Sequence, residues 1–565
     1  MTDATASPAP ASAARPSAIA GFETVHAAFA ATAARAAASP FVAVIPTVAK
    51  AYGIATGEWS YGECLERIER LRARYARAGW GHGHRVGLLL ENRPAFFLHW
   101  LALNALGVSV VPINADLRAS ELDYLVEHSG IGLAVALASR HADLAAAARR
   151  TGSTLGLVAD ADGEPDRLPA FPSPPGLAPR PGDPTLDTEC ALLYTSGTTG
   201  RPKGCVLTNA YFLICGERYR TLGGLCALEP GDRLITPLPL VHMNAMACST
   251  MAMLMTGGCL IQLDRFHPRS WWDDVRAADA TILHYLGVMP AMLMGDAPSQ
   301  ADRAHRVRFG FGAGVDRRLH APFEARFGFP LIEGWAMTET GMAGVIIAQR
   351  EPRHVGTACF GRPDVTVEVR LVDEAGADVP VGTPGELLVR CAGGDPRRGF
   401  FAEYLKDPQA TAAAWEGGWF HTGDVVQADA DGYLYFIDRR KNVIRRSGEN
   451  IAAVEVESVL RRHPAVREVA VAATPDAVRG DEVLACVVAH ESPADDECEA
   501  RARTIVAWAL EQLAYYKVPG WVAFVDALPL TATQKIQRGE LKALAAALPG
   551  TARCVDTRSM KKRSA

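Results

Sequence analysis

Apolar and amphipathic stretches alternate along the first part of the chain. Short apolar runs bounded by turn residues are typical of buried strands, and the longer stretches between them have the spacing of helices. The pattern predicts strands at 86–90, 109–113 and 131–137, with helices at 94–106 and 121–128. Strands that alternate with helices form parallel sheets with right-handed crossovers, so we expect a doubly wound α/β subdomain here.

A second alternation of the same kind follows residue 243. It predicts helices at 244–255 and 271–277 and strands at 259–263 and 281–286. We therefore expect two α/β subdomains in the N-terminal part of the chain. The longest apolar stretch, 243–255, has about 13 residues, whereas a membrane span needs roughly 20, so we expect no transmembrane segment.

The pattern changes after residue 361. Between 361 and 438, short alternating runs are separated by Gly/Pro turns, which indicates an antiparallel, partly barrel-like and β-rich subdomain. A compact α+β unit follows, with predicted helices at 452–462 and 500–513 and strands at 466–472 and 483–489. The predicted domains are a lead-in at 1–20, a large N-terminal domain at 21–440, a small C-terminal domain at 441–545 and a tail at 546–565.

Composition narrows the class of protein. The 565 residues are too many for one core, and 49% apolar residues, 21% charged residues and a net charge of −5 are ordinary for a globular enzyme without a nucleic-acid partner. The 12 cysteines form no C-x-x-C pair, so we expect reduced thiols in a cytoplasmic protein. Residues 1–20 are rich in Ala, Pro and Ser without a continuous apolar core, which favours a disordered lead-in over a signal peptide and leaves a transit peptide as the alternative.

The most restrictive segment is 194–204, Tyr-Thr-Ser-Gly-Thr-Thr-Gly-Arg-Pro-Lys-Gly, which follows an apolar run. Glycines let the backbone approach an anion, hydroxyl groups add donors and Lys203 supplies a positive charge, so the segment predicts a phosphate-binding loop. An ordinary surface turn is the alternative. The P-loop of nucleotide triphosphatases is excluded because it requires glycine directly before its lysine, where this chain has Pro202.

Three further segments carry candidate chemistry. In 333–340, Glu-Gly-Trp-Ala-Met-Thr-Glu-Thr, a hydroxyl beside the Glu339 carboxylate suits Mg²⁺, although a Thr-Glu pair also marks helix starts. Asp424, at the end of Trp-Phe-His-Thr-Gly-Asp, could accept from both ribose hydroxyls or cap a turn. Arg439, near the start of 438–450, could donate to ribose and phosphate oxygens or belong to a solvated basic face.

Together with 529–538, Pro-Leu-Thr-Ala-Thr-Gln-Lys-Ile-Gln-Arg, these segments resemble in order the motifs of the adenylate-forming enzymes. That superfamily includes acyl-CoA synthetases, adenylation domains of peptide synthetases and luciferases. The resemblance extends from about residue 25 to residue 540. Within it, residues 240–345 look most similar to crotonobetaine/carnitine-CoA ligases and to related bile-acid and medium-chain acyl-CoA ligases.

The resemblance implies an AMP-forming acid–thiol ligase that works in two steps. A small-molecule carboxylic acid attacks the α-phosphate of ATP to give an acyl-adenylate and pyrophosphate, and the thiol of coenzyme A then displaces AMP. It also implies Mg²⁺ as the metal and a small domain that rotates about a hinge between the steps.

Several alternatives stay open beside this interpretation. We favour coenzyme A as the acceptor because no carrier-protein segment follows the small domain in the sequence. A separate carrier protein, a degenerate ATP- and acyl-binding protein and luciferase-like oxygenation are the alternatives. The oligomeric state is open, with a homodimer as one option.

The family's site residues transfer to matching positions in this sequence. The resemblance implies catalytic roles for Lys535, Thr338, Glu339 and His242, with Glu339 as metal ligand, Lys441 as hinge, and coenzyme A contacts at Ser447, Gly448 and Glu449. It implies an acyl pocket at His242, Met243, Gly312, Ala336 and Met337. It implies ATP contacts at Thr195, Ser196, Gly197, Thr198, Thr199, Gly200, Lys203, Gly312, Ala313, Gly334, Trp335, Thr338, Asp424, Arg439 and Lys535.

The chain departs from the family's pattern at four positions. Trp335 and Ala336 replace a tyrosine and a glycine; Trp335 still offers an aromatic face to adenine, and the Ala336 methyl group should narrow the acyl pocket modestly. Asn442 replaces an aspartate after the hinge residue. Gln534 replaces the glycine before Lys535, so we expect a stiffer or differently shaped loop there, which bears on the efficiency of adenylation.

Overall fold

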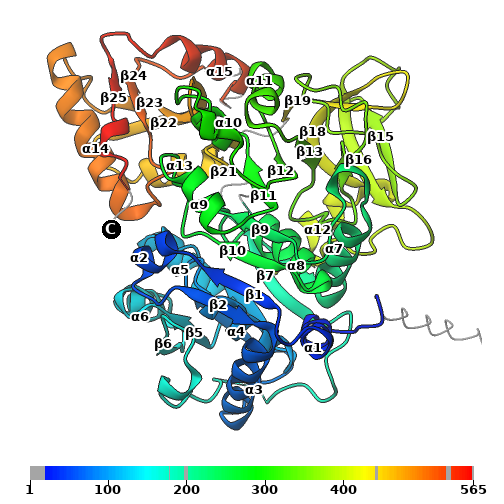
Figure 1. The fold of residues 1–565 in the computed structure, drawn as a ribbon. Helices are drawn as coiled ribbons and strands as arrows, with labels where there is room; N and C mark the ends of the chain where they lie inside the picture. Colours follow the sequence, from blue (N-terminus) through cyan, green and yellow to red (C-terminus); the bar gives the residue numbers. More distant parts are fainter. Residues whose placement is uncertain (1–18, 177, 196–200, 440–442, 530–535, 563–565) are drawn as a thin grey trace, which may run out of the picture.

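The computed structural model describes residues 19–176, 178–195, 201–439, 443–529 and 536–562. Figure 1 shows a large N-terminal part, coloured blue to yellow-green, and a smaller orange to red C-terminal part that lies against it. None of the helices in these ranges combines the length and hydropathy that crossing a bilayer requires.

The first α/β subdomain is built on a seven-stranded sheet of order β17-β8-β7-β4-β3-β5-β6. Its strands are β3 (Arg85–Leu89), β4 (Ser109–Pro112), β5 (Leu133–Ala136), β6 (Gly156–Ala159), β7 (Glu189–Thr195), β8 (Lys203–Thr208) and β17 (Glu403–Tyr404). Neighbouring strands from β7 to β6 pair in parallel, and the connections contain α4 (Ala95–Asn104), α5 (Ala119–Ser129) and α6 (His141–Thr151). The predicted alternation of strands and helices is confirmed.

The second α/β subdomain has an eight-stranded sheet of order β14-β13-β12-β11-β9-β10-β1-β2. Its strands are β1 (Pro40–Val44), β2 (Gly57–Ser60), β9 (Arg233–Thr236), β10 (Cys259–Gln262), β11 (Ile282–Leu286), β12 (Phe309–Ala313), β13 (Leu331–Trp335) and β14 (Ile346–Ile347). The inner strands pair in parallel and the two edge strands pair antiparallel. The helices of this part are α1 (Val25–Arg35), α2 (Pro46–Tyr52), α3 (Tyr61–Arg77), α7 (Asn209–Thr221), α8 (Thr250–Thr256), α9 (Trp271–Ala277), α10 (Val288–Leu293) and α11 (Arg317–Phe327).

The helix predicted at 244–255 differs from a regular α-helix in its first half. Residues 244–249 form a π-helix, and α8 begins only at Thr250. The side chains of Ser249 and Asn244 both lie against the buried His284 Nδ1, at 2.7 Å and 3.0 Å. A widened turn brings both side chains to this histidine, and such π-segments are frequent at functional sites.

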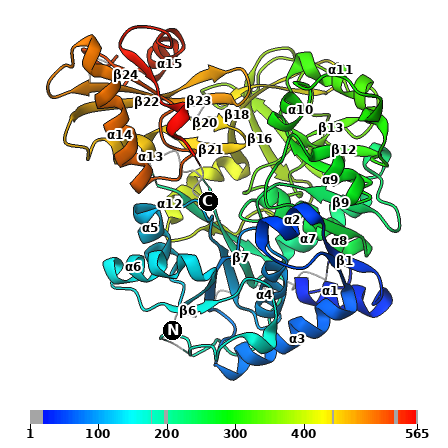
Figure 2. The ribbon, with the colours of Figure 1, turned by 60° about the vertical axis from the view of Figure 1, so that its left-hand side comes forward.

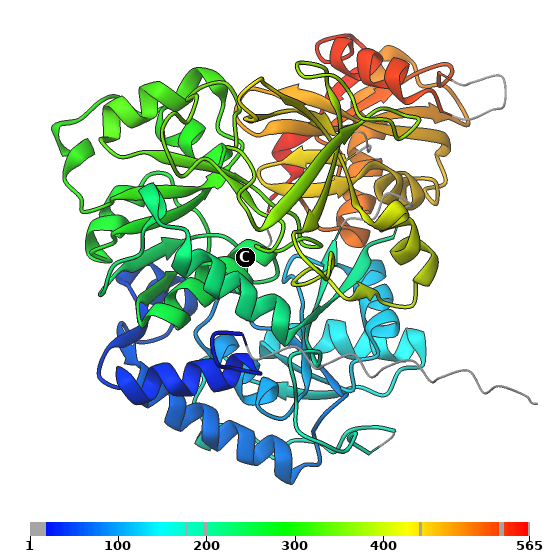
Figure 3. The same cartoon turned by 90° about the vertical axis from the view of Figure 1, so that its right-hand side faces the viewer.

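The β-rich subdomain is an antiparallel sheet, as predicted between 361 and 438. Its strand order is β15-β16-β18-β19, and its elements are β15 (Val367–Val372), β16 (Gly385–Cys391), β18 (Phe420–Ala428), β19 (Leu434–Arg439) and the nearby helix α12 (Pro408–Ala414). Figure 3, turned to face this side, shows its yellow-green strands toward the viewer.

The C-terminal part has a six-stranded sheet with helices on both faces. Its elements are β20 (Val443–Arg446), β21 (Glu449–Ala452), β22 (Val466–Asp476), β23 (Gly480–Ala489), β24 (Trp521–Phe524), β25 (Cys554–Asp556), α13 (Ala453–Leu460), α14 (Cys498–Gln512) and α15 (Arg538–Ala547). Along β22, Val469 and Val471 pack with α13 and α14, whereas Ala470 packs with α15. This two-residue alternation gives the unit cores of its own. Figure 2 shows α14 above α5 of the large part, and the two helices are in contact.

Residues 554–561 differ from the predicted tail. β25 pairs with β24, and the Thr557 amide donates to the Gly520 carbonyl at 2.9 Å. The Lys561 side chain is buried and its Nζ lies 2.5 Å from Glu482 Oε1. The segment completes the C-terminal sheet because it supplies an edge strand and a partner for a buried carboxylate.

Candidate active site

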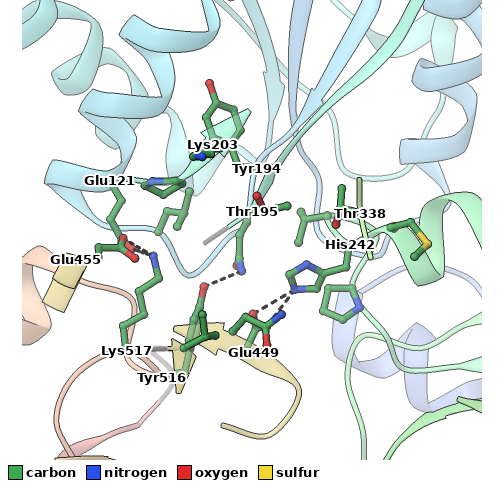
Figure 4. A pocket seen from close by; sticks show the side chains of 18 of the residues that line it. Glu121, Tyr194, Thr195, Lys203, His242, Thr338, Glu449, Glu455, Tyr516 and Lys517 are labelled. Atoms are coloured by element: carbon green, nitrogen blue, oxygen red, sulfur yellow. Dashed lines mark hydrogen bonds and ion pairs between the residues drawn. The ribbon is translucent and has the colours of Figure 1, made fainter. Parts of the chain in front are cut away.

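A cavity of about 580 Å³ lies where the large part meets the C-terminal part. It gathers eleven of the site residues predicted from sequence: Thr195, Lys203, His242, Met243, Ala336, Met337, Thr338, Glu339, Asp424, Gly448 and Glu449. Figure 4 shows several of them facing one space from different elements.

The other predicted site residues fall into two groups. Gly312, Ala313, Gly334, Trp335 and Ser447 are described but do not line the cavity. Ser196, Gly197, Thr198, Thr199, Gly200, Lys441 and Lys535 lie outside the described residues, as does the side chain of Arg439.

The two strands that flank the predicted phosphate loop pair with each other. β7 and β8 pair antiparallel, and Thr195 faces Lys203 in register, so the two ends of the predicted loop are held side by side. The Lys203 ammonium lies 4.5 Å from the centre of the Tyr404 ring, a cation–π contact. The hairpin therefore fixes the backbone position of Lys203, and the contact with Tyr404 holds its ammonium at the cavity wall.

Glu339 is buried and has a defined partner in the same wall. Tyr404 donates its hydroxyl to Glu339 Oε1 at 2.8 Å, and the Phe401 amide donates to the Glu339 carbonyl at 2.8 Å. Burial and the nearby carboxylate raise the pKa of Tyr404, so its hydroxyl stays protonated and keeps donating. Nothing in the sequence around Tyr404 indicated this role, because only the pairing of β17 with β8 brings it to Glu339.

Asp424 is oriented by Trp335. The Trp335 indole N–H donates to Asp424 Oδ2 at 2.9 Å, and both side chains are buried. On β18, Asp424 faces Arg439 of β19 in register, so the two predicted ribose contacts start from neighbouring backbone positions. The stacking of Trp335 on adenine stays a prediction. The hydrogen bond to Asp424 is a separate role of the same indole.

Glu333 braces the segment between β12 and α11. Its carboxylate accepts from the amides of Gly314 at 2.8 Å and Val315 at 3.2 Å, and from the Tyr285 hydroxyl at 2.9 Å. Burial raises the pKa of the Glu333 carboxyl despite these donors. The glutamate begins the predicted 333–340 motif, but its bracing function follows only from the tertiary fold.

Four residues of the predicted acyl pocket line the cavity together with Asn244: they are His242, Met243, Ala336 and Met337. Behind Asn244, the fully buried His284 also has its Nε2 2.8 Å from the Tyr219 hydroxyl. Burial lowers the pKa of His284 to about 3, so this histidine is neutral and holds the wall in place by hydrogen bonds.

The turn between β20 and β21 reaches into the cavity from the C-terminal part. Ser447 and Gly448 have positive φ, 49° and 90°, and a side chain at Gly448 would come within 2.2 Å of Leu286 Cδ1. Glu449 Oε2 lies 3.2 Å from His242 Nε2. Burial disfavours the charged imidazole, but the Glu449 carboxylate outweighs it and raises the pKa of His242.

Comparison with known protein families identifies the chain. The family model of the AMP-binding enzyme matches residues 28–394, and that of the AMP-binding enzyme C-terminal domain matches residues 455–535. The chain belongs to the AMP-binding enzyme family. The adenylate-forming resemblance inferred from the sequence is thereby confirmed.

Individual relatives agree with this assignment. The chain is 31% identical over 496 residues to the crotonobetaine/carnitine–CoA ligase of Salmonella agona (strain SL483), covering 86% of this chain and 93% of that protein. A malonyl-CoA ligase in a ternary product complex with methylmalonyl-CoA and AMP is 27% identical, with a TM-score of 0.69 over 87% of this chain and 96% of the other. The fold is also shared with o-succinylbenzoate CoA synthetase from Bacillus subtilis, at 23% identity, a TM-score of 0.76, and coverage of 91% and 98%.

Proposed function

We propose that this AMP-binding enzyme is an ATP-dependent acyl-CoA ligase. The observation that carries the proposal is the convergence on one cavity of the phosphate-loop ends, the Glu339 carboxylate, the Asp424 carboxylate and the turn at Gly448. The first three groups suit ATP, and the turn comes from the C-terminal part that would serve the second step.

In the first step, a carboxylate oxygen of the acid bonds to the α-phosphorus of ATP and pyrophosphate leaves. Lys203, Arg439 and Lys535 would offset the charge of the crowded anions, and stabilising charge at the reacting phosphate is a large contribution to rate. Asp424, held by Trp335, would accept from the ribose hydroxyls. Lys535 is assigned by its match to the family's motif.

The donor set at Glu339 fits Mg²⁺. Magnesium prefers oxygen ligands and is usually bound by one or two carboxylates together with substrate phosphates. Glu339 supplies one buried carboxylate, Thr338 adds a neighbouring hydroxyl on the cavity wall, and the described residues contain no cluster of three or more ligands that would hold a metal alone. When bound, the ion would supply charge neutralisation at the phosphates.

In the second step, the sulfur of a thiolate bonds to the acyl carbon and AMP leaves with its phosphate oxygen. The Ser447–Gly448–Glu449 turn would admit the thiol-bearing arm of coenzyme A, because glycine lets a ligand pass close to the backbone. The His242–Glu449 contact would hold the imidazole to one side of this path. Lys441 would be the hinge between the two arrangements.

The names of the relatives indicate candidate acids. Relatives named crotonobetaine/carnitine–CoA ligase make betaine-type acids the first candidates, and the ligase that was solved with methylmalonyl-CoA makes short dicarboxylic acids the second. Ala336 and the methionines Met243 and Met337 give an apolar, adaptable acyl end.

A pyrophosphate-release screen tests the function. Betaine-type, short, medium-chain, aromatic and steroid carboxylates are each supplied with ATP and Mg²⁺, with and without coenzyme A, and thioesters are identified by mass spectrometry. We expect one class of acid to give pyrophosphate, AMP and an acyl-CoA. Lys535→Ala should abolish pyrophosphate release yet still form thioester from a supplied acyl-adenylate.

Other outcomes would assign a different function. Acyl transfer only to a phosphopantetheinylated carrier protein would indicate a carrier-loading adenylation enzyme. ATP binding without AMP formation from any acid would indicate a degenerate binding protein.

A further inference from the structure

A buried lysine joins the two parts of the molecule at the edge of the cavity. Lys517 Nζ lies 2.6 Å from Glu121 Oε1 and 2.7 Å from Glu455 Oε1. Glu121 belongs to α5 of the large part, whereas Lys517 and Glu455 belong to the C-terminal part. All three side chains are buried, and in Figure 4 dashed lines join Lys517 to both carboxylates.

Glu121 is held on the large part independently of Lys517. It occupies the first turn of α5, where its Oε2 accepts from the Arg118 amide at 3.0 Å. The same oxygen accepts from the Ala514 amide of the C-terminal part at 2.8 Å. The carboxylate is thus pre-oriented by its own helix and receives two donors from the other part.

Further polar contacts surround this ion pair. Ser120 donates to the Gln512 carbonyl at 2.9 Å, and Asn114 donates its side-chain amide to the Tyr516 hydroxyl at 3.3 Å. The segment 512–517 therefore docks on the start of α5 through directional bonds, which specify one relative arrangement of the two parts.

The charges favour this arrangement. Burial disfavours the ammonium, but Glu121 and Glu455 together raise the pKa of Lys517 above its usual value, so it stays protonated. If the two parts separated, Lys517 would keep Glu455 and lose Glu121. A contact that exists in one arrangement shifts the equilibrium toward that arrangement by its differential free energy.

We propose that the Lys517–Glu121 ion pair is a positioning device that selects the arrangement for thioester formation. In this arrangement the Gly448 turn lies against Leu286 and Glu449 faces His242. Tyr516 and Lys517 line the same cavity as Gly448 and Glu449, so the ion pair and the turn belong to one site. The inference rests on the proposed two-step function.

Two substitutions test it. Glu121→Gln removes the charge and keeps an oxygen for the two backbone donors, and Lys517→Met removes the ammonium at similar length. Each half-reaction is measured in a single turnover: pyrophosphate release from acid and ATP, and thioester formation from supplied acyl-adenylate and coenzyme A. We expect thioester formation to fall about 10-fold in Glu121→Gln and about 100-fold in Lys517→Met, and pyrophosphate release to change less than about 3-fold.

Lys561→Met is the matched control. Lys561 is also a buried lysine paired with a carboxylate, but its partner Glu482 belongs to the same part of the chain. Its loss should lower the unfolding temperature without changing the ratio of the two half-reactions. A double variant of Glu121→Gln and Lys517→Met should be no slower in thioester formation than Lys517→Met alone, because the two residues act as one unit.

The outcomes separate the inference from the proposed function. If the parent protein releases no pyrophosphate with any acid, the proposed acyl-CoA ligase function is itself wrong. That result differs from one that contradicts only the role of the ion pair. If the parent is active but both half-reactions fall equally in Glu121→Gln, or the two variants add independently, the positioning role is refuted. Should Lys517→Met fail to fold, Glu121→Gln alone decides.

Discussion

At the scale of single residues, the site depends on side chains that hold other side chains. Tyr404 donates to Glu339, Trp335 donates to Asp424, and Glu333 accepts from the backbone at 314–315. A carboxylate that must meet phosphate, metal or ribose at a set position gains from such bracing, because less reorganisation remains for the reaction.

Removing the brace on Glu339 should slow adenylation less than removing the carboxylate. We expect Glu339→Gln to reduce pyrophosphate release about 1,000-fold, through lost metal binding and charge. Tyr404→Phe should reduce it about 10-fold, the effect of one hydrogen bond to a charged group. Pyrophosphate release at several Mg²⁺ concentrations measures both.

Tyr435→Phe is the control, because its hydroxyl donates to Asp429 at 2.7 Å and neither residue lines the cavity. Equal losses in Tyr404→Phe and Tyr435→Phe would contradict a specific role for Tyr404.

The His242–Glu449 contact predicts a pH dependence. Because the pKa of His242 is raised in the fold, the pair stabilises the protein fully below the ordinary histidine value of about 6.5 and loses its effect as pH rises through the raised pKa. The difference in unfolding temperature between the parent and Glu449→Gln should therefore be larger at pH 6 than at pH 9. An equal difference at both values would show that His242 is not charged in this arrangement.

At the scale of elements, the final described segment is part of a domain rather than an appendage. β25 covers the edge of β24, and Lys561 joins Arg446 at the buried Glu482, with Arg446 Nε 2.8 Å from Glu482 Oε2. β23 and β24 separate β25 from β20 in the sheet, so the charge cluster at Glu482 ties the final segment to the middle of the C-terminal sheet.

Deleting residues 553–565 should destabilise the C-terminal part. Loss of one partner from a buried charge cluster typically lowers the free energy of unfolding by about 3–5 kcal/mol, and the loss of strand pairing lowers it further. Thermal unfolding measured by calorimetry should show an early transition for this part. Deleting 563–565 alone keeps Lys561 and is the control; an unchanged unfolding profile after the longer deletion would contradict the prediction.

Part of the secondary structure was predictable. Periodicity located β3, β4, β5, β10 and β11 with the helices α4, α5, α8 and α9, because those strands are mostly apolar and the helices between them have a regular spacing. The other strands and helices of the two α/β subdomains were not assigned from the pattern. It did not predict the π-helix at 244–249, which depends on a histidine 35 residues further along the chain. It also left β25 unassigned, since three residues at a sheet edge carry little periodicity.

At the scale of the whole molecule, the arrangement of the two parts decides which groups share the cavity. The described arrangement brings the Gly448 turn to Leu286, a packing that depends on the absence of a side chain.

Gly448→Ala should therefore act on one step. An added methyl group meets Leu286 at 2.2 Å and also occupies a backbone conformation with φ of 90°, which costs about 1 kcal/mol for a non-glycine residue. We expect thioester formation to fall at least about 10-fold while pyrophosphate release stays within about 3-fold. Adding Leu286→Ala should restore only the part of the lost thioester formation that the steric contact causes. Equal inhibition of both steps would contradict the prediction.

The sequence by itself determined the family and the fold class: ordered local motifs resemble those of the adenylate-forming enzymes, and hydrophobic periodicity predicts two α/β subdomains and a C-terminal α+β unit. Only the tertiary structure decided which residues support those motifs. Tyr404 meets Glu339 across a strand pairing, and Lys517 meets Glu121 across 396 positions of sequence. Such partners leave no signal in the local sequence, because residues far apart along the chain come into contact only when it folds.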